Sequence, residues 1–69
     1  MNVNKTIAEN IFKFRSAVGI SQNELAARLG VSPQAVSKWE HGLCCPDIAL
    51  LPLLADVFGK SIDELFREN

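Results

Sequence analysis

The sequence predicts an all-α fold, a compact domain of five short helices without a β-strand. Its apolar residues recur three or four positions apart, which is the spacing of one buried helix face, and they do not alternate as in a strand. Most of these stretches follow a Ser, Thr or Asp that can cap a helix, and most end at a glycine. The 69 residues are also near the lower limit for a core without disulfides or a metal, which favours a compact, helix-rich domain.

The first helix is expected over residues 6–18. Thr6 and Glu9 have the spacing of a capping box, in which each side chain bonds the backbone N–H of the other residue. Gly19 follows directly and can adopt the left-handed conformation that ends a helix. Four apolar residues are expected on the buried face: Ile7, Ile11, Phe14 and Val18.

The second helix is expected over residues 22–29. Ser21 and Glu24 form a second capping box, and Gly30 stands where a left-handed cap is needed. Val31 is expected to pack inward as the chain reverses. The inward positions of this helix are Leu25, Ala26 and Leu29.

The third helix is expected over residues 33–41. Ser32 is its cap, and Pro33 takes the first helical position, where the missing N–H costs nothing. Val36 and Trp39 point inward, and Trp39 is expected to fill the core rather than to stack on a base. The remaining residues form a short outward surface, which is the candidate functional surface: Gln34, Ala35, Ser37 and Lys38.

A fourth helix is expected between a cap at Asp47 and a stop at Gly59. Pro52 removes one intrahelical bond, so either the first turn is irregular or the helix starts nearer Leu50. The expected inward residues are Ile48, Leu51, Leu54, Ala55 and Phe58. The fifth helix is predicted from a third capping box and three apolar residues: Ser61 with Glu64, and Ile62, Leu65 and Phe66.

Composition bounds the class of protein. Hydrophobic residues make up 48% of the chain, but no run approaches the roughly 20 apolar residues that cross a bilayer. The first residues lack the pattern of a secretory signal, so a cytoplasmic location is expected. The net charge of −1 is unevenly spread, with +2 over residues 1–46 and −3 over residues 47–69, which would let one face meet a polyanion.

No cofactor, metal or small-molecule effector is expected. Cys44 and Cys45 are adjacent, with His41 nearby, but this spacing matches no set of metal ligands. A redox-sensing or metal-sensing pair therefore stands as the alternative to two small loop residues. The chain also has no nucleophile, base and metal set at workable spacing, so an enzyme is not expected.

One run resembles the DNA-binding unit of the Cro/C1-type (XRE-like) repressor family: SQNELAARLGVSPQAVSKWE, residues 21–40. The resemblance extends over residues 7–66 and includes the Cys45-Pro46-Asp47 turn and the ending from Gly59 to Leu65. It implies a compact, five-helix, lambda-repressor-like domain over residues 1–69. Its helix-turn-helix would lie at about residues 22–41. Related domains often precede other modules, so the chain as one piece of a longer protein stays open.

The resemblance implies sequence-specific binding of double-stranded DNA by a transcriptional regulator, expected to be a repressor. The helix over residues 33–41 would enter a major groove roughly 12 Å wide. Gln34 can make two bonds to an adenine edge, and Lys38 can reach guanine or a phosphate. Ser37 can donate to either, while Pro33 and Ala35 offer apolar surface to a thymine methyl.

Contacts to the DNA backbone are expected from the flanks of this helix. Gln22 and Ser32, at the starts of two helices, are assigned to phosphate. His41 is assigned to phosphate too, although a histidine there also suits the helix dipole. In this family Arg15 and Glu40 resemble a pair that ties the first helix to the third; the alternative is Arg15 on phosphate.

Some apolar residues stand where relatives of this family carry polar ones, and they indicate a partner surface. Leu50, Leu53 and Val57 form a second apolar stripe on the fourth helix. Phe12, on the first helix, is the fourth residue of the predicted partner surface. A symmetric homodimer is the economical interpretation; a slightly rotated core is the alternative. The rival function is a protein-interaction or antitoxin-like module that uses the same fold.

Overall fold

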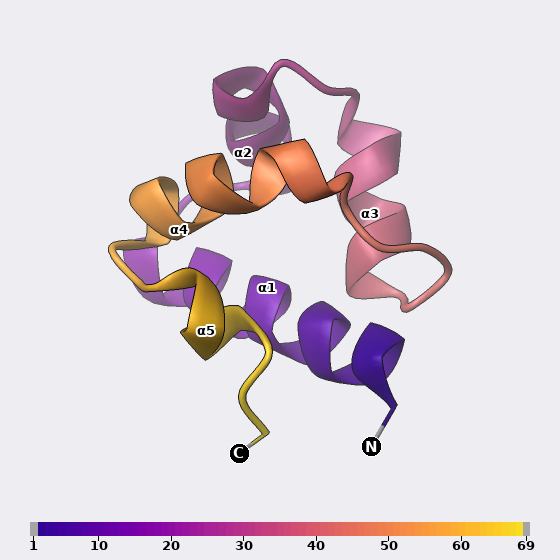
Figure 1. Cartoon of the computed structure of the whole chain (residues 1–69). Helices are drawn as coiled ribbons and strands as arrows, with labels where there is room; N and C mark the ends of the chain where they lie inside the picture. Colours follow the sequence, from indigo (N-terminus) through magenta and orange to yellow (C-terminus); the bar gives the residue numbers. More distant parts are fainter. Residues whose placement is uncertain (1, 69) are drawn as a thin grey trace.

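The computed structural model describes residues 2–68, and within them the chain is all-α, as predicted (Figure 1). Five α-helices and one short 3-10 turn follow in order, and this part of the chain contains no strand. The elements are α1 (Val3–Val18), α2 (Gln22–Leu29), α3 (Pro33–Glu40), the 3-10 turn η1 (Ile48–Leu50), α4 (Leu51–Phe58) and α5 (Ile62–Leu65).

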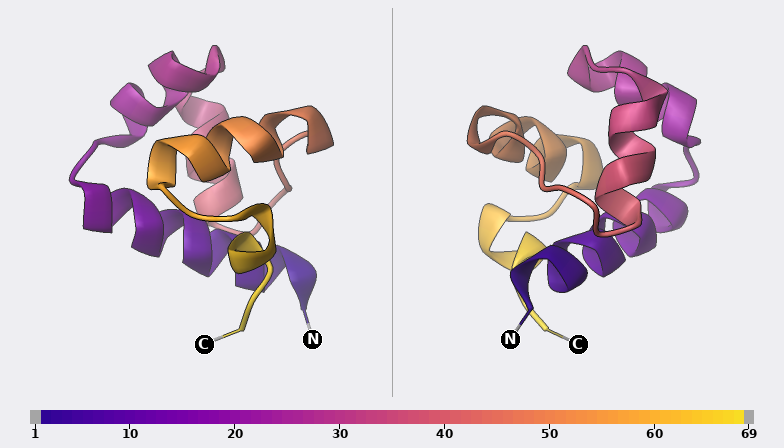
Figure 2. Two further views of the ribbon diagram at one scale, coloured as in Figure 1. Left: turned by 60° about the vertical axis from the view of Figure 1, so that its left-hand side comes forward. Right: turned by 90° about the vertical axis from the view of Figure 1, so that its right-hand side faces the viewer.

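The helices surround one core. α3 packs against both α1 and α2, while α4 and α5 pack on each other and on α1. Figure 2 shows α3 at the edge of the molecule, where no other helix covers its outer side. The arrangement therefore leaves one short helix free to contact a partner.

The core draws on every α-helix. Its largest fully buried apolar side chains are Ile11, Leu25, Val36, Leu54 and Leu65. Phe14 and Phe58 meet edge to face, with ring centroids 5.9 Å apart, and so join α1 to α4. Trp39 is 4% exposed and belongs to this core, as predicted from the inward face of α3. Burial of these side chains is the main force that holds such short helices in place.

The helix ends follow the predicted capping signals in most places. Both capping boxes at Ser21–Glu24 and Ser61–Glu64 are present. Gly30 has a φ of +73°, a left-handed conformation that side chains disfavour, and its backbone N–H closes the end of α2. These two features fix where α2 begins and ends, and so fix the approach to α3.

The predicted start of α1 is wrong. The helix begins at Val3, because the Asn2 side chain accepts the backbone N–H of Lys5 and supplies a cap one turn earlier. Thr6 is buried inside the helix and does not cap it. At the other end Val18 is exposed, since the chain turns at Gly19 and Ile20 enters the core instead.

The start of the fourth helix is irregular, as Pro52 predicted. Residues 48–50 form the separate turn η1, in which Leu51 donates its N–H to the carbonyl of Ile48. Because this turn does not follow the winding of α4, Ile48 is 81% exposed, and its predicted inward position is wrong. Among residues 2–68 no helix combines the length and hydrophobicity that crossing a membrane requires.

Candidate nucleic-acid interface

The outer face of α3 is the candidate functional surface, made up of Gln34, Ala35, Ser37 and Lys38. Val36 and Trp39, on the opposite side of the same helix, are buried and hold α3 against the core. The side chains of Gln34 and Lys38 are exposed, Ser37 is half-buried, and Ala35 packs partly against the core. An amide, a hydroxyl and an ammonium group are therefore presented from a fixed helix.

The start of α3 is set by two residues with different roles. The Ser32 hydroxyl accepts the backbone N–H of Ala35 at 3.2 Å, which makes it the cap predicted from the sequence. Pro33 occupies the first helical position and is exposed. The Ser32 oxygen accepts this one bond, and its hydroxyl hydrogen is still available to a partner that accepts.

The turn before α3 is short and closed. Val31 donates its N–H to the carbonyl of Ala26 at 3.0 Å across the left-handed Gly30. Ala26 is fully buried, and α2 packs against α3. A side chain this small suits a close approach between helices. The pair thus has the form of a helix-turn-helix, with α3 as its exposed second helix.

A polar network at the start of α2 joins α1, α2 and α3. Arg15 and Glu40, the two residues expected to pair, are joined by Nε–Oε2 at 2.6 Å and Nη2–Oε1 at 3.1 Å. Their side chains are only 14% and 5% exposed. The hydrogen bond to Glu40 raises the pKa of Arg15 above its ordinary value. Arg15 also donates from Nη1 to the carbonyl of Ile20 at 2.8 Å.

Gln22 is the third member of this network, which sequence reasoning did not anticipate. It is half-buried, and its Nε2 donates to Glu40 Oε1 at 3.0 Å. The bond spans 18 residues and depends on how α2 meets the end of α3, so nothing local in the sequence could have indicated it. One amide hydrogen of Gln22 remains for another acceptor.

His41 is the residue that ends α3, and it is exposed. Its Nδ1 lies 2.7 Å from the carbonyl oxygen of Ser37 and 3.4 Å from the Ser37 hydroxyl. Because a carbonyl only accepts, Nδ1 carries the hydrogen and Nε2 is the nitrogen available to a partner. The ring thus caps the helix and can still reach outward.

The residues of the predicted partner surface lie in two places. Leu50, Leu53 and Val57 are on η1 and α4; Leu53 is 45% exposed, while the other two pack partly against the core. Phe12 is 55% exposed on α1, and the guanidinium carbon of Arg15 lies 5.5 Å from its ring centroid. Ile48, beside the α4 group, is a further exposed apolar residue that the predicted surface lacked.

Cys44 and Cys45 are free and exposed in the loop after α3. The Cys45 thiol donates to Asn4 Oδ1 at 2.7 Å, which ties this loop to the first turn of α1. Within residues 2–68, no three His, Cys, Asp or Glu side chains are grouped so that they could hold a metal ion. The hydrogen bond from Cys45 to Asn4 gives this loop a structural role.

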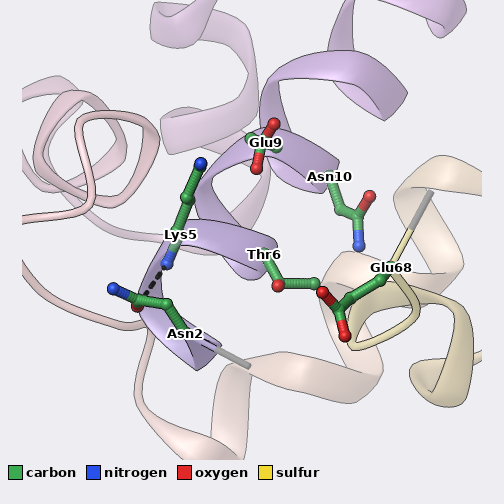
Figure 3. Close-up of a pocket in the computed structure, with 6 residues that line it drawn as sticks. All are labelled: Asn2, Lys5, Thr6, Glu9, Asn10 and Glu68. Carbon is green, nitrogen blue, oxygen red and sulfur yellow. Dashed lines mark hydrogen bonds between the residues drawn. The ribbon is translucent and has the colours of Figure 1, made fainter.

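A polar hollow of about 400 Å³ lies beside the start of α1 (Figure 3). It is lined by Asn2, by polar residues of α1 and by Glu68, and by no residue of the outer face of α3. Beside it, the buried Asn10 donates its amide to the backbone carbonyls of Leu65 at 2.7 Å and Arg67 at 3.0 Å. Asn10 therefore fastens the C-terminal segment to α1. The sequence signal was a polar residue between the buried Ile7 and Ile11.

Comparison with known proteins also identifies a helix-turn-helix. Residues 11–65 match the family described as Helix-turn-helix. The HTH-type transcriptional activator BcrR of Enterococcus faecalis is 37% identical over 57 residues, which are 83% of this chain and 28% of that protein. The SPbeta prophage-derived HTH-type transcriptional regulator YonR of Bacillus subtilis is 36% identical over 59 residues, covering 86% and 55%.

A shorter relative is matched over most of its length. The HTH-type transcriptional regulator y4dJ of Sinorhizobium fredii is 35% identical over 65 residues, covering 94% of this chain and 84% of that protein. Among solved structures, the crystal structure of FeII HppE matches with a TM-score of 0.85 and 30% identity, covering 94% of this chain and 34% of that one. The chain thus spans about half or less of BcrR and YonR, and about a third of the chain in the solved structure.

Proposed function

Because this chain belongs to the Cro/C1-type helix-turn-helix family, we propose that it binds double-stranded DNA sequence-specifically and regulates transcription. The observation that carries the proposal is the outer face of α3, which no helix covers. Val36 and Trp39 anchor that helix in the core while Gln34 and Lys38 stand exposed. Fixed polar groups on an exposed helix suit readout of base edges in a major groove.

The base contacts are proposed from the outer face of α3. The Gln34 amide would pair with an adenine edge, and the Lys38 ammonium would reach guanine acceptors or a phosphate. Ser37 has its hydroxyl within 3.4 Å of His41, so it would serve either group as a secondary contact. Pro33, which is exposed, would meet a thymine methyl, with the half-buried Ala35 contributing less surface.

The backbone contacts are proposed from the two helix starts and the end of α3. Ser32 would donate its hydroxyl hydrogen and Gln22 its second amide hydrogen to phosphate oxygens. His41 would donate from Nε2 in its imidazolium form, in which both ring nitrogens carry a hydrogen. The supporting geometry is that each group already has one internal bond that fixes its direction. Such contacts set the register of a protein on DNA without carrying sequence information.

A homodimeric repressor in the cytoplasm is the form in which we propose that the protein acts. Two copies of α3 would read inverted half-sites about one helical turn apart. The exposed Leu53, with Leu50 and Val57 beside it, supports a self-complementary apolar contact. The small positive charge of residues 1–46 also supports a dimer, because a lone copy makes few phosphate contacts.

Enzymatic activity is not part of the proposal. The match to the FeII HppE structure covers a third of that chain, so it supports a shared helical domain only. A protein-interaction module is the competing function, favoured by the exposed apolar side chains of Leu53 and Ile48. The two differ in whether the outer face of α3 has a nucleic-acid partner.

Selection of a random duplex library against the purified protein tests the proposal. After several rounds at moderate salt, we expect an enriched inverted repeat, and the isolated winning duplex should bind far more tightly than a scrambled one. Absence of enrichment, with circular dichroism showing a folded helical protein, would overturn DNA reading by this chain. It would leave the interaction module as the better explanation.

A further inference from the structure

Glu40 has more partners than a simple ion pair requires. Its Oε2 accepts Arg15 Nε at 2.6 Å, and its Oε1 accepts both Arg15 Nη2 at 3.1 Å and Gln22 Nε2 at 3.0 Å. The carboxylate is 5% exposed, and Arg15 is held on its other side by the carbonyl of Ile20 at 2.8 Å. A two-bond guanidinium fork of this kind has little freedom, so the carboxylate is fixed in place.

This arrangement decides which way the Gln22 amide faces. An amide has a donor end and an acceptor end of nearly the same shape, and its orientation follows from its partners. An ionised carboxylate only accepts, so Gln22 must turn its nitrogen toward Glu40. One of the two hydrogens on Nε2 is then used, and the other is held in a set direction at the first residue of α2.

The network also links the two helices of the helix-turn-helix. Glu40 is the last residue of α3, and Gln22 is the first residue of α2. An anion bound by the free Gln22 hydrogen would therefore have a fixed position relative to the outer face of α3. The positive charge of Arg15 compensates the carboxylate beside it, so Glu40 does not repel an approaching phosphate.

We infer that Glu40 is a positioning residue for DNA binding: it orients the Gln22 amide so that the second Nε2 hydrogen donates to a phosphate oxygen. This inference rests on the proposed function, and it adds a role for a side chain that would touch no DNA itself. It predicts that the contribution of Gln22 to affinity exists only while an acceptor stands at position 40.

A double-mutant cycle tests the coupling. Gln22→Ala is compared in the wild-type background and in the R15M/E40L background, which removes both charges together so that neither is left buried and unpaired. We expect Gln22→Ala to weaken binding about tenfold in the first background, the size of one bond to a charged group, and less than twofold in the second. Arg15 is present in both proteins of the wild-type pair and absent from both proteins of the R15M/E40L pair. Any phosphate contact of Arg15 itself therefore cancels within each comparison.

One feature separates a phosphate contact of Gln22 from a base contact. The loss in the wild-type background should be equal on the selected duplex and on a scrambled duplex, because a phosphate contact carries no sequence information. Equal losses from Gln22→Ala in both backgrounds, or no loss in the wild type, would overturn the inference while leaving DNA binding itself intact. A wild-type protein that binds no duplex would instead remove the proposed function.

A second measurement covers the case in which R15M/E40L does not fold. The Gln22 side-chain amide of the wild-type protein is observed by NMR, with the exposed amide of Gln34 as the comparison. We expect the Gln22 amide of the free protein to be as rigid as the backbone, with an order parameter near 0.85, and its signals to shift when DNA is added. A mobile amide, or signals unmoved by bound DNA, would overturn the inference.

Discussion

Arg15 and Glu40 lie 25 residues apart in the chain and are joined by two hydrogen bonds of 2.6 and 3.1 Å, which tie the last turn of α1 to the end of α3. The pair is largely shielded from water. Removing one partner therefore strands the other charge in a poorly solvated place, whereas removing both does not. The position of α3 on the core depends on this pair as well as on Val36 and Trp39.

Single replacement of Arg15 should cost more stability than replacement of the pair. We expect Arg15→Met to lower the free energy of unfolding by about 3 kcal/mol, because Glu40 then keeps a shielded charge without its counter-ion. R15M/E40L should lose clearly less. Urea unfolding followed by circular dichroism measures both, and a double variant less stable than Arg15→Met alone would contradict the role given to the pair.

Gly30 should tolerate asparagine better than alanine. Its φ of +73° disfavours any side chain, although an added Cβ would meet no atom within 4 Å. We expect Gly30→Ala to cost about 1 kcal/mol through backbone strain alone, and Gly30→Asn to cost less, since asparagine enters this conformation more readily. Thermal unfolding of the two variants checks this order. Equal stability of Gly30→Ala and wild type would show that the turn relaxes.

Acid should weaken the capping box at the start of α5, to which Glu64 belongs. Its pKa is lowered from 4.5 chiefly by the hydrogen bond from the Ser61 backbone, with smaller help from the Ser61 side chain, Lys60 and Arg67. A lowered pKa means that the charged form stabilises the folded state above pH 4.5 and that this contribution is lost as pH falls through the folded value. NMR titration of the Glu64 carboxyl should give a midpoint below 4.5. The Glu64→Gln variant should lack this part of the acid dependence, and a midpoint at or above 4.5 would contradict the cap.

A charge on the exposed apolar group of α4 should prevent self-association. Leu53→Glu is matched by Val18→Glu, a control at a similarly exposed apolar residue at the end of α1. Sedimentation equilibrium of wild type and control should show dimers at concentrations where Leu53→Glu is a monomer, because the carboxylate would have to be desolvated in the interface. A wild-type monomer at high concentration, or a dimer that survives Leu53→Glu, would exclude this surface.

Much of the fold could be predicted because the signals are local. Capping boxes, glycine stops and a buried stripe on each helix are contained within a few neighbouring residues, and the same local pattern predicts Trp39 in the core. The start of α1 was missed because Asn2 and Thr6 are both acceptable caps, and only burial of Thr6 against the fold selects Asn2. Ile48 was missed because helix periodicity does not hold across a 3-10 turn.

The site was predicted less completely, for a related reason. The outer face of α3 follows from periodicity, and the Arg15–Glu40 pair followed from family resemblance. The bond from Gln22 to Glu40 and the hold of Asn10 on the carbonyls of Leu65 and Arg67 depend on packing between helices far apart in sequence. Polar contacts of this kind have no sequence period, so they emerge only when the helices are placed.

Parallel selection of random duplex DNA with wild type, Gln34→Ala and Asn23→Ala tests sequence reading by α3 most directly. Asn23 is the control, an exposed side-chain amide that lies on α2. We expect all three proteins to enrich the same inverted repeat, with Gln34→Ala alone losing its preference at one base pair of each half-site, because one bidentate amide–adenine contact is removed. An unchanged preference in Gln34→Ala, or no enriched repeat with folded wild-type protein, would contradict base reading from this helix.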